Sequence, residues 1–238
     1  IDASVITDTN DTTTITLSDI ADKDYSFTVK GAASVDTVSG SGVVDTIFGN
    51  GGADSIDGAA GDDVIDGGAG NDSITGGTGQ DTLTGGAGND KFLYAIGSSQ
   101  STVAKPDTIT DLTTGTDTIR LSITTAVSTT YDYTNKGEVA NSSEAIEKLS
   151  GVIGQYVFDT TAGAMKMEVD NNGLLQATDF GLKITGASKL NAADVNFDII
   201  TTNGGTGAII TTGGGADTFD LKDPTDKVTA GAGNDKIT

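Results

Sequence analysis

The chain has 238 residues, of which 35% are hydrophobic and 5% aromatic, and its formal net charge is −21. This charge disfavours nucleic acid and anionic membranes as partners and favours cations. Because the chain contains neither cysteine nor histidine, it has no disulfide, no thiolate metal site and no histidine base, which disfavours most enzyme chemistries. No apolar run approaches the ~18 residues that a membrane helix needs, so we expect no membrane insertion.

The first 30 residues contain no glycine, and apolar and polar residues alternate in TTITLS and YSFTVK. Such alternation is typical of strands that bury one face. We therefore expect residues 1–30 to form an N-terminal β segment that precedes or caps the next unit. The chain begins with Ile1 and carries no recognisable signal peptide, so we expect it to be an internal part of a longer protein.

Residues 31–93 repeat every nine positions. Seven consecutive nonapeptides, called lines below, begin at Gly31, Gly40, Gly49, Gly58, Gly67, Gly76 and Gly85. Each line has an aspartate at place six, and these are Asp36, Asp45, Asp54, Asp63, Asp72, Asp81 and Asp90. Each line has an apolar residue at place eight, and these are Val38, Ile47, Ile56, Ile65, Ile74, Leu83 and Phe92. Glycine occupies place one of every line, but places one, two and four are all glycine only in the later lines, from Gly67 onward.

One line is interpreted as a glycine-rich turn followed by a short strand that points place eight inward. Two lines would complete one coil, so the turns of a line and of the line after next stack and bring their aspartates together. Crowded aspartates repel each other, and glycine loses much backbone entropy on folding. A hard cation offsets both costs, because Ca²⁺ takes roughly 6–8 oxygen ligands from carboxylates and carbonyls. The pattern thus predicts calcium between stacked turns.

Residues 94–202 lose this period and are interpreted as a β-rich closing unit. A strand-like run of Thr, Ile and Leu lies within residues 101–122. NSSEAIEKLSG, residues 141–151, has the start, the interior and the final glycine of one short helix. QYVFDTTAGAMKMEVDNNGLL, residues 155–175, alternates apolar and polar residues around Asn-Gly, which predicts a hairpin.

The nonapeptide frame returns in residues 203–238, as TGGGADTFD from Thr212, LKDPTDKVT from Leu221 and AGAGNDKIT from Ala230. The aspartates at place six of these lines are Asp217, Asp226 and Asp235. The line from Leu221 lacks glycine and is expected to stack without metal. We interpret residues 203–238 as a second, partial repeat block.

These lines resemble the RTX (repeats-in-toxin) family, whose nonapeptide G-G-x-G-x-D-x-U-x is a signature of a calcium-binding parallel β-helix. The resemblance covers residues 31–93 and, in part, residues 212–238. It implies an all-β chain built on a right-handed parallel β-roll. It also implies that each calcium takes the carbonyls of places two and four and the aspartate of one line. The carbonyls of places one and three and the aspartate of the line after next complete the ligand set.

Carried over to this sequence, the resemblance implies three complete calcium sites. The first would use Asn50, Gly52, Asp54, Gly67, Ala69 and Asp72. The second would use Ala59, Gly61, Asp63, Gly76, Thr78 and Asp81. The third would use Gly68, Gly70, Asp72, Gly85, Ala87 and Asp90. A C-terminal site would use Gly213, Gly215, Asp217, Ala230, Ala232 and Asp235.

A fourth site in the first block would run through Asp45 and Asp63, with Val43 standing where glycine is expected. Ser34 likewise replaces a glycine beside the pair Asp36 and Asp54. Three further aspartates lie off the ligand places and are interpreted as surface charge, namely Asp57, Asp62 and Asp66.

Residues 91–195 also resemble the β-rich unit that closes RTX rolls in secreted proteases and in some bacterial surface-layer proteins. DTITDLTTGTDTIRLS and LKITGASKLNAADV carry this likeness. Asp107 and Asp117 in this segment are candidate ligands of a peripheral calcium. The resemblances imply a non-enzymatic, calcium-dependent structural module of an exported protein. We expect a surface-layer protein of a Gram-negative bacterium, secreted by a type I system, that self-associates into an extracellular array.

Other interpretations remain open at this point. The chain could be the RTX module of a secreted adhesin, which would share most of these features. It could also be the targeting module of a secreted hydrolase, although it contains neither H-E-x-x-H nor G-x-S-x-G. Ice binding on a flat threonine array is disfavoured, because places seven and nine mix threonine with charged, aliphatic and aromatic residues.

Overall fold

The computed structural model describes residues 5–7, 14–17, 26–96, 105–125, 130–133, 135–140, 156–160, 162–167, 180–185, 189–201, 209–221 and 224–238. Regular structure in these residues is β, apart from one short 3₁₀ helix, η1 (Ala192–Asp194). The all-β class and the parallel β-roll expected from the sequence are confirmed. The helix expected at residues 141–151 lies outside the described residues. Among those described, no helix is long and apolar enough to cross a membrane.

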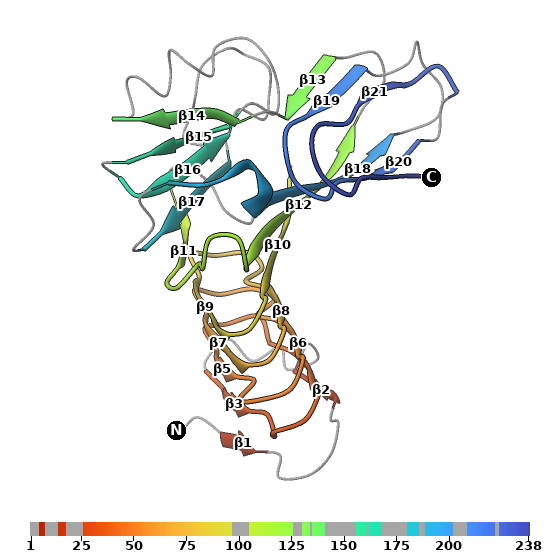
Figure 1. The fold of residues 1–238 in the computed structure, drawn as a ribbon. Coiled ribbons are helices and arrows are strands. Elements are labelled where there is room, and N and C mark those ends of the chain that lie inside the picture. The colour runs from red at the N-terminus through yellow and green to blue at the C-terminus, as the bar shows by residue number, and fades with distance from the viewer. Residues whose placement is uncertain are drawn as a thin grey trace.

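The stem in Figure 1 is the β-roll, in which successive strands alternate between two sheets. The first sheet contains β1 (Val5–Thr7), β3 (Thr28–Lys30), β5 (Thr46–Phe48), β7 (Val64–Ala69), β9 (Thr82–Ala87) and β11 (Asp107–Ile109). The second contains β2 (Thr14–Thr16), β4 (Thr37–Ser39), β6 (Ser55–Asp57), β8 (Ser73–Thr75), β10 (Lys91–Ala95) and β12 (Thr118–Thr125). Neighbouring strands in both sheets run parallel. The strands predicted within residues 1–30 therefore continue the same two sheets.

The pairing register explains how a thin apolar core suffices. Ile47 pairs with Ile65, and Ile56 pairs with Ile74, so equivalent places stack one coil apart. The place-eight side chains of all seven lines are at most 2% exposed. Each line therefore contributes one side chain to a narrow core between the sheets, and most of the remaining surface faces the turns or solvent.

Both sheets continue beyond the roll into the two arms of a T-shaped molecule (Figure 1). The first sheet extends through β17 (Phe180–Ile184), β16 (Ala164–Met167), β15 (Tyr156–Asp159) and β14 (Asn135–Val139). β16 is antiparallel to both β15 and β17. The β16–β17 pair agrees with the predicted hairpin, whose Asn-Gly turn lies outside the described residues. The β15–β16 hairpin was not predicted, and it carries a buried ion pair between Lys166 Nζ and Asp159 Oδ2 at 2.8 Å.

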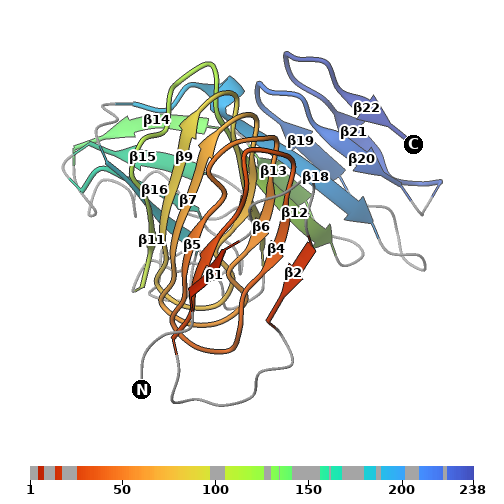
Figure 2. The same ribbon diagram turned by 90° about the horizontal axis from the view of Figure 1, so that it is seen from below.

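The second sheet extends into the other arm through β18 (Val195–Thr201), β20 (Thr218–Asp220) and β22 (Lys236–Ile237). A third sheet covers it with β13 (Thr130–Tyr133), β19 (Ile209–Thr212) and β21 (Lys227–Thr229). Figure 2 shows these C-terminal strands beside the roll rather than on its axis. Asp217 Oδ1 accepts the backbone N–H of Phe197, whereas in the roll the corresponding donor is the N–H of another aspartate. The aspartate columns of the roll therefore do not run on into the C-terminal block.

Candidate metal centres

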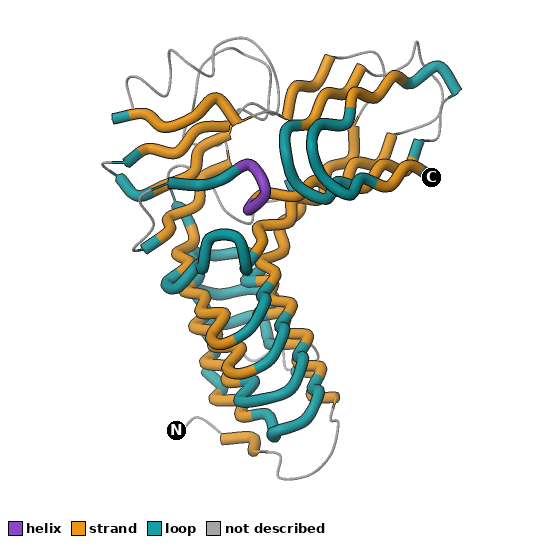
Figure 3. The backbone as a smooth tube through the Cα atoms, in the orientation of Figure 1, coloured by secondary structure: helices purple, strands orange, loops and turns teal. Residues whose placement is uncertain are grey.

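The place-six aspartates form two columns, because each one ends a turn and directly precedes a strand (Figure 3). One column precedes second-sheet strands and contains Asp36, Asp54, Asp72 and Asp90; the other precedes first-sheet strands and contains Asp45, Asp63 and Asp81. All seven are at most 2% exposed. Burying seven carboxylates between stacked turns is unfavourable unless something compensates their charge.

In the complete lines, one oxygen of each carboxylate, Oδ1, accepts a hydrogen bond from the coil before it. Oδ1 of Asp54, for example, accepts the backbone N–H of Asp36 at 2.8 Å, and Oδ1 of Asp72 accepts that of Asp54 at 2.8 Å. The same bond recurs at Asp63, Asp81 and Asp90 with distances of 2.7, 2.8 and 2.9 Å. Oδ1 thus faces the preceding coil throughout the roll.

The second oxygen divides the lines into two classes. In the five lines from Gly49 to Gly85, called the complete lines below, Oδ2 of the aspartate is buried and has no hydrogen-bond partner among the described residues. In the lines from Gly31 and Gly40, called the incomplete lines, Oδ2 accepts the place-two N–H. These bonds join Ala32 N to Asp36 and Ser41 N to Asp45, both at 2.7 Å, and the Ser41 hydroxyl adds one at 2.9 Å.

Backbone conformation separates the same two classes. Place two has a positive φ in every complete line, from 70° at Asn50 to 105° at Gly77, and place four ranges from 121° at Gly52 to 149° at Gly88. No residue of the incomplete lines has a positive φ. Glycine adopts this conformation without strain, whereas Ser34 and Val43 at place four would not. The turn chemistry therefore decides whether Oδ2 is satisfied by its own line.

Beside the first glycine of a line, the aspartate Oδ2 lies near a carbonyl oxygen of the line after next, in both incomplete lines and in three complete ones. A Cβ built on Gly49 would lie 2.5 Å from Asp54 Oδ2 and 2.4 Å from Gly67 O. Gly58 is likewise flanked by Asp63 Oδ2 and Gly76 O, and Gly67 by Asp72 Oδ2 and Gly85 O. Each pair combines a carboxylate with the carbonyl of the line after next. These are the oxygen types that a hard cation binds, and they belong to the first, second and third expected sites.

The carbonyls expected at places two, three and four lie in the same stacked turns. Ala69 N donates to Asn50 O at 2.8 Å, and Ala69 O accepts Gly52 N at 2.8 Å. Thr78 makes equivalent bonds, to Ala59 and Gly61 at 2.9 Å. A carbonyl oxygen has two lone pairs, so these acceptors keep capacity for a cation. Within the described residues no three acidic side chains gather at one point.

Burial raises the pKa of the complete-line carboxyls. The pKa of Asp63 rises to about 8, and the pKa values of Asp54 and Asp81 rise to about 6. Burial also raises the pKa of Asp72 and of Asp90. The Oδ1 hydrogen bond opposes the rise, and the neighbouring aspartates add to it. A bound divalent cation would reverse this balance by favouring the ionised form.

The C-terminal lines reproduce part of this arrangement. Asp217 is 1% exposed, its Oδ1 accepts Phe197 N at 2.9 Å, and its own N–H donates to Asp235 Oδ1 at 3.1 Å. Gly213 O accepts Ala232 N at 3.0 Å. Gly215 has a positive φ of 121°, as place four has in the complete lines. Thr212, which the repeat pattern did not single out, hydrogen-bonds the Asp217 carboxylate.

Two aspartates of the closing unit, Asp107 and Asp117, extend the columns, although the sequence suggested them only as ligands of a peripheral calcium. Asp107 Oδ1 accepts Asp81 N at 2.9 Å, and Asp117 Oδ1 accepts Asp90 N at 3.0 Å. Asp111 accepts the N–H groups of Gly85 and Gly86 at 2.9 and 2.8 Å. They lie outside the nine-residue period, and the only available signal is an aspartate directly before a strand-like run.

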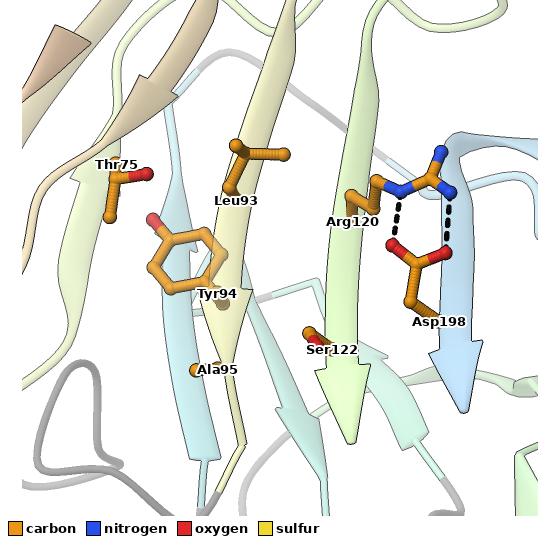
Figure 4. A pocket seen from close by; sticks show the side chains of 7 residues that line it. All are labelled: Thr75, Leu93, Tyr94, Ala95, Arg120, Ser122 and Asp198. Atoms are coloured by element: carbon orange, nitrogen blue, oxygen red, sulfur yellow. Dashed lines mark hydrogen bonds and ion pairs between the residues drawn. The ribbon is translucent and has the colours of Figure 1, made fainter. Parts of the chain in front are cut away.

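A separate cavity of about 310 Å³ lies on the outer face of the second sheet, where β10, β12 and β18 meet (Figure 4). Arg120 forms a bidentate pair with Asp198 there and reaches Thr218 Oγ1 at 3.3 Å. The Asp198 hydrogen bond raises the pKa of Arg120. The remaining lining is made of Thr75, Leu93, Tyr94, Ala95 and Ser122. We assign the ion pair the role of joining three neighbouring strands.

Comparison with known proteins agrees with this architecture. The family model of the peptidase M10 serralysin C-terminal region matches residues 8–197. No curated protein is significantly similar to the chain. Among solved structures, the chain is similar to the solution structure of the AlgE6R3 subunit from the Azotobacter vinelandii mannuronan C5-epimerase. That match has 22% identity and a TM-score of 0.30, and it covers 76% of this chain and 83% of the other.

Proposed function

Because the chain belongs to the peptidase M10 serralysin C-terminal family, we propose that it is a calcium-binding RTX module with a structural rather than catalytic role. The observation that carries this proposal is the set of buried Oδ2 atoms without a partner in Asp54, Asp63, Asp72, Asp81 and Asp90. Calcium, when bound, supplies the positive charge that the stacked turns lack. The chain's own residues present its oxygen ligands and hold consecutive coils in register.

The three complete sites are assigned as the sequence implied. Asp54 Oδ2 and Gly67 O would hold the first calcium, together with the carbonyls of Asn50, Gly52 and Ala69 and the Asp72 carboxylate. The second set contains Ala59, Gly61, Asp63, Gly76, Thr78 and Asp81, and the third contains Gly68, Gly70, Asp72, Gly85, Ala87 and Asp90. The fourth, through Asp45, is disfavoured because Ser41 already donates twice to Asp45 Oδ2.

The C-terminal set, Gly213, Gly215, Asp217, Ala230, Ala232 and Asp235, is proposed as a further calcium site. It is more open than the others, since Ala230 and Asp235 are only partly buried. We also propose that residues 31–93, 94–202 and 203–238 act as roll, closing unit and second block, preceded by the N-terminal segment 1–30. Because two continuous sheets join them, these units are expected to unfold with some cooperativity.

Folding should depend on calcium. The apolar core of the roll is narrow, and its carboxylates are uncompensated without metal, so binding energy contributes directly to folding. Circular dichroism of the whole chain in excess EGTA should show less β signal than in millimolar calcium. The same β signal in both conditions would contradict the proposal. Magnesium at equal ionic strength is the control, because its octahedral geometry suits this open carbonyl set poorly.

The exported, extracellular setting is proposed from the same chemistry. Extracellular calcium modules bind at ~10⁻⁴–10⁻³ M, so such sites fill outside a cell and stay unfilled in cytosol. A chain of this kind could pass a type I secretion system unfolded and fold outside a Gram-negative cell. We favour a surface-layer protein that self-associates into an array, over the RTX module of an adhesin or of a secreted hydrolase.

The surface of the second block supports self-association. β22 and β21 end their sheets, and Ile237 at place eight is 57% exposed, whereas place eight is buried throughout the roll. A parallel strand edge with an exposed apolar side chain tends to add another coil. Light scattering and electron microscopy with calcium and with chelator test this. Ordered sheets in calcium support the array, and monomers at millimolar calcium would favour the hydrolase module.

A further inference from the structure

Asp62 stands at place five of the line from Gly58, next to the second expected calcium site but outside its ligand set. A Cβ built on Gly79 would lie 1.8 Å from Gly61 O, a carbonyl of that set, and 3.2 Å from Asp62 Oδ1. The same Oδ1 accepts Gln80 N from the line after next at 2.9 Å. The Asp62 side chain is exposed. Its carboxylate therefore lies at the surface, close to a carbonyl that would hold the cation.

The other two repeat sites carry uncharged residues at place five. In the third site Asn71 Oδ1 accepts Asn89 N at 2.9 Å and lies 3.1 Å from a Cβ built on Gly88, so it repeats the contacts of Asp62 without the charge. In the first site the residue at this place is Ala53, whose side chain has no acceptor. The three sites thus form a series with a charged acceptor, a neutral acceptor and no acceptor beside the place-four carbonyl.

The charge of Asp62 distinguishes the surroundings of the second site from those of the first. Burial raises the pKa of both second-site carboxyls, Asp63 and Asp81, and the charge of Asp62 adds to the rise at each. The other charged neighbours are matched, because each of the two sites also has one aspartate of the preceding coil and one aspartate at place nine. The third site has a different neighbour, Asp111, which acts on Asp90. The first site is therefore the reference for the effect of Asp62.

A negative charge at the edge of a site attracts a divalent cation even where it does not contact the ion. We propose that Asp62 sets the affinity of the second site, which it strengthens through its charge and not as a ligand. The second site then binds calcium more tightly than the first. One partly screened unit charge changes the Kd for a divalent cation by about 3- to 10-fold. The lines from Gly58 and Gly76 are then joined by metal before the lines from Gly49 and Gly67.

This inference rests on the proposed calcium-binding function, and isothermal titration of the full chain with calcium tests it. Asp62→Asn keeps an acceptor for Gln80 N, as Asn71 does in the third site, and removes only the charge. It should weaken one calcium by about 3- to 10-fold and leave the others unchanged. The control Glu138→Gln removes an equal charge from an exposed position on β14 and should leave every step as in the wild type.

The outcomes separate this inference from the proposed function. Equal titrations for Asp62→Asn and the wild type, or an equal weakening in Asp62→Asn and Glu138→Gln, overturn the role of Asp62 while leaving the sites in place. A wild type that binds no calcium overturns the proposed function itself. In an Asp81→Asn background, which removes the second site, Asp62→Asn should have no further effect. A weakening that persists in this background overturns the assignment to the second site.

Salt and a converse variant test the mechanism without removing any ligand. The difference between Asp62→Asn and the wild type should shrink as ionic strength rises from about 0.01 to 1 M, because the Debye length falls from roughly 30 to 3 Å. A constant difference would mean that Asp62 acts through its hydrogen bond, and overturns the charge mechanism. Ala53→Asp places a carboxylate at place five of the first site and should tighten one calcium by a similar factor. Val35→Asp adds the same charge to an incomplete line, and an equal effect of both variants contradicts the inference.

Discussion

The incomplete lines, residues 31–48, and the complete lines, residues 49–93, have the same strands but different turns. Both place an apolar side chain in the core, and Asp45 holds its Oδ1 on the backbone of the preceding coil as the aspartates of the complete lines do. They differ in Oδ2, which is satisfied within its own line in the first region and has no partner in the second. Places six and eight thus build the roll, and places two and four decide whether Oδ2 is satisfied within its own line.

The same fold holds buried carboxylates in two different environments. At Asp45 the carboxylate has three protein donors, from Phe27 N, Ser41 N and the Ser41 hydroxyl. At Asp63 the described residues provide one donor, the N–H of Asp45, and burial raises the pKa of Asp63 to about 8. The first arrangement is stable in calcium-free solution, whereas the second favours either a proton or a cation.

The largest expected contrast is between Asp72→Ala and Asp36→Ala. Asp72 stands in the middle of its column and belongs to the first and third sites, whereas Asp36 is satisfied by Ala32 N. Asp72→Ala should lose two calciums. At a calcium concentration about 100-fold above Kd each site contributes ~2.7 kcal/mol to the free energy of unfolding, so the variant should lose about 5 kcal/mol. Asp36→Ala should lose none. Equal calorimetric losses for both variants would contradict the division into two classes.

Much of the difference between complete and incomplete lines could be foreseen from the sequence. What could not be foreseen has physical causes. The nine-residue period at Asp54 and Ile56 predicts strand, core position and ligand place together, because one residue type serves one role in every line. The state of Oδ2 could not be foreseen, since it depends on φ at place two, and Ala59 adopts a positive φ that its residue type disfavours. Asp107 and Asp117 were foreseen as candidate ligands of a peripheral calcium but not as members of the columns, because longer spacings separate them from the repeats.

The second contrast tests the glycines of the complete turns. A Cβ on Gly70 would lie 1.5 Å from Gly52 O, and Gly70 has φ of +143°, whereas a Cβ on Gly42 would meet nothing within 4 Å. Gly70→Ala should cost roughly 3 kcal/mol in calcium, from strain and backbone displacement at two sites. Gly42→Ala should be neutral or stabilise by about 0.4–1 kcal/mol. Thermal unfolding in saturating calcium measures both, and a matched loss in the two would argue against the distinction between turns.

The third contrast uses pH. The folded-state pKa of Asp63 is raised to about 8 from its ordinary 3.8, so without calcium the folded form binds the extra proton and loses stability as pH rises through 8. Calcium needs the ionised form, so its affinity should rise with pH, by up to ~10-fold per pH unit between pH 6 and 8 at the second site. Titrations in two buffers of different ionisation enthalpy should reveal proton release. Asp63→Asn should reduce that release above pH 7, where Asp54 and Asp81, with pKa values of about 6, are already largely ionised. Unchanged release in the variant would remove Asp63 from the site.

The smallest contrast concerns strain at place two, where Ala59 has φ of +72° while its neighbour Ala60 does not have a positive φ. An alanine in this conformation costs about 1–2 kcal/mol, and the extra freedom of glycine in the unfolded chain costs about 0.4–1 kcal/mol. Ala59→Gly should therefore stabilise the calcium-bound chain by ~0.5–1 kcal/mol. Ala60→Gly gains no relief and should destabilise it by a similar amount. The two variants have the same composition and differ only in the position of the new glycine. If their urea midpoints shifted in the same direction, the positive φ at Ala59 would not be a source of strain.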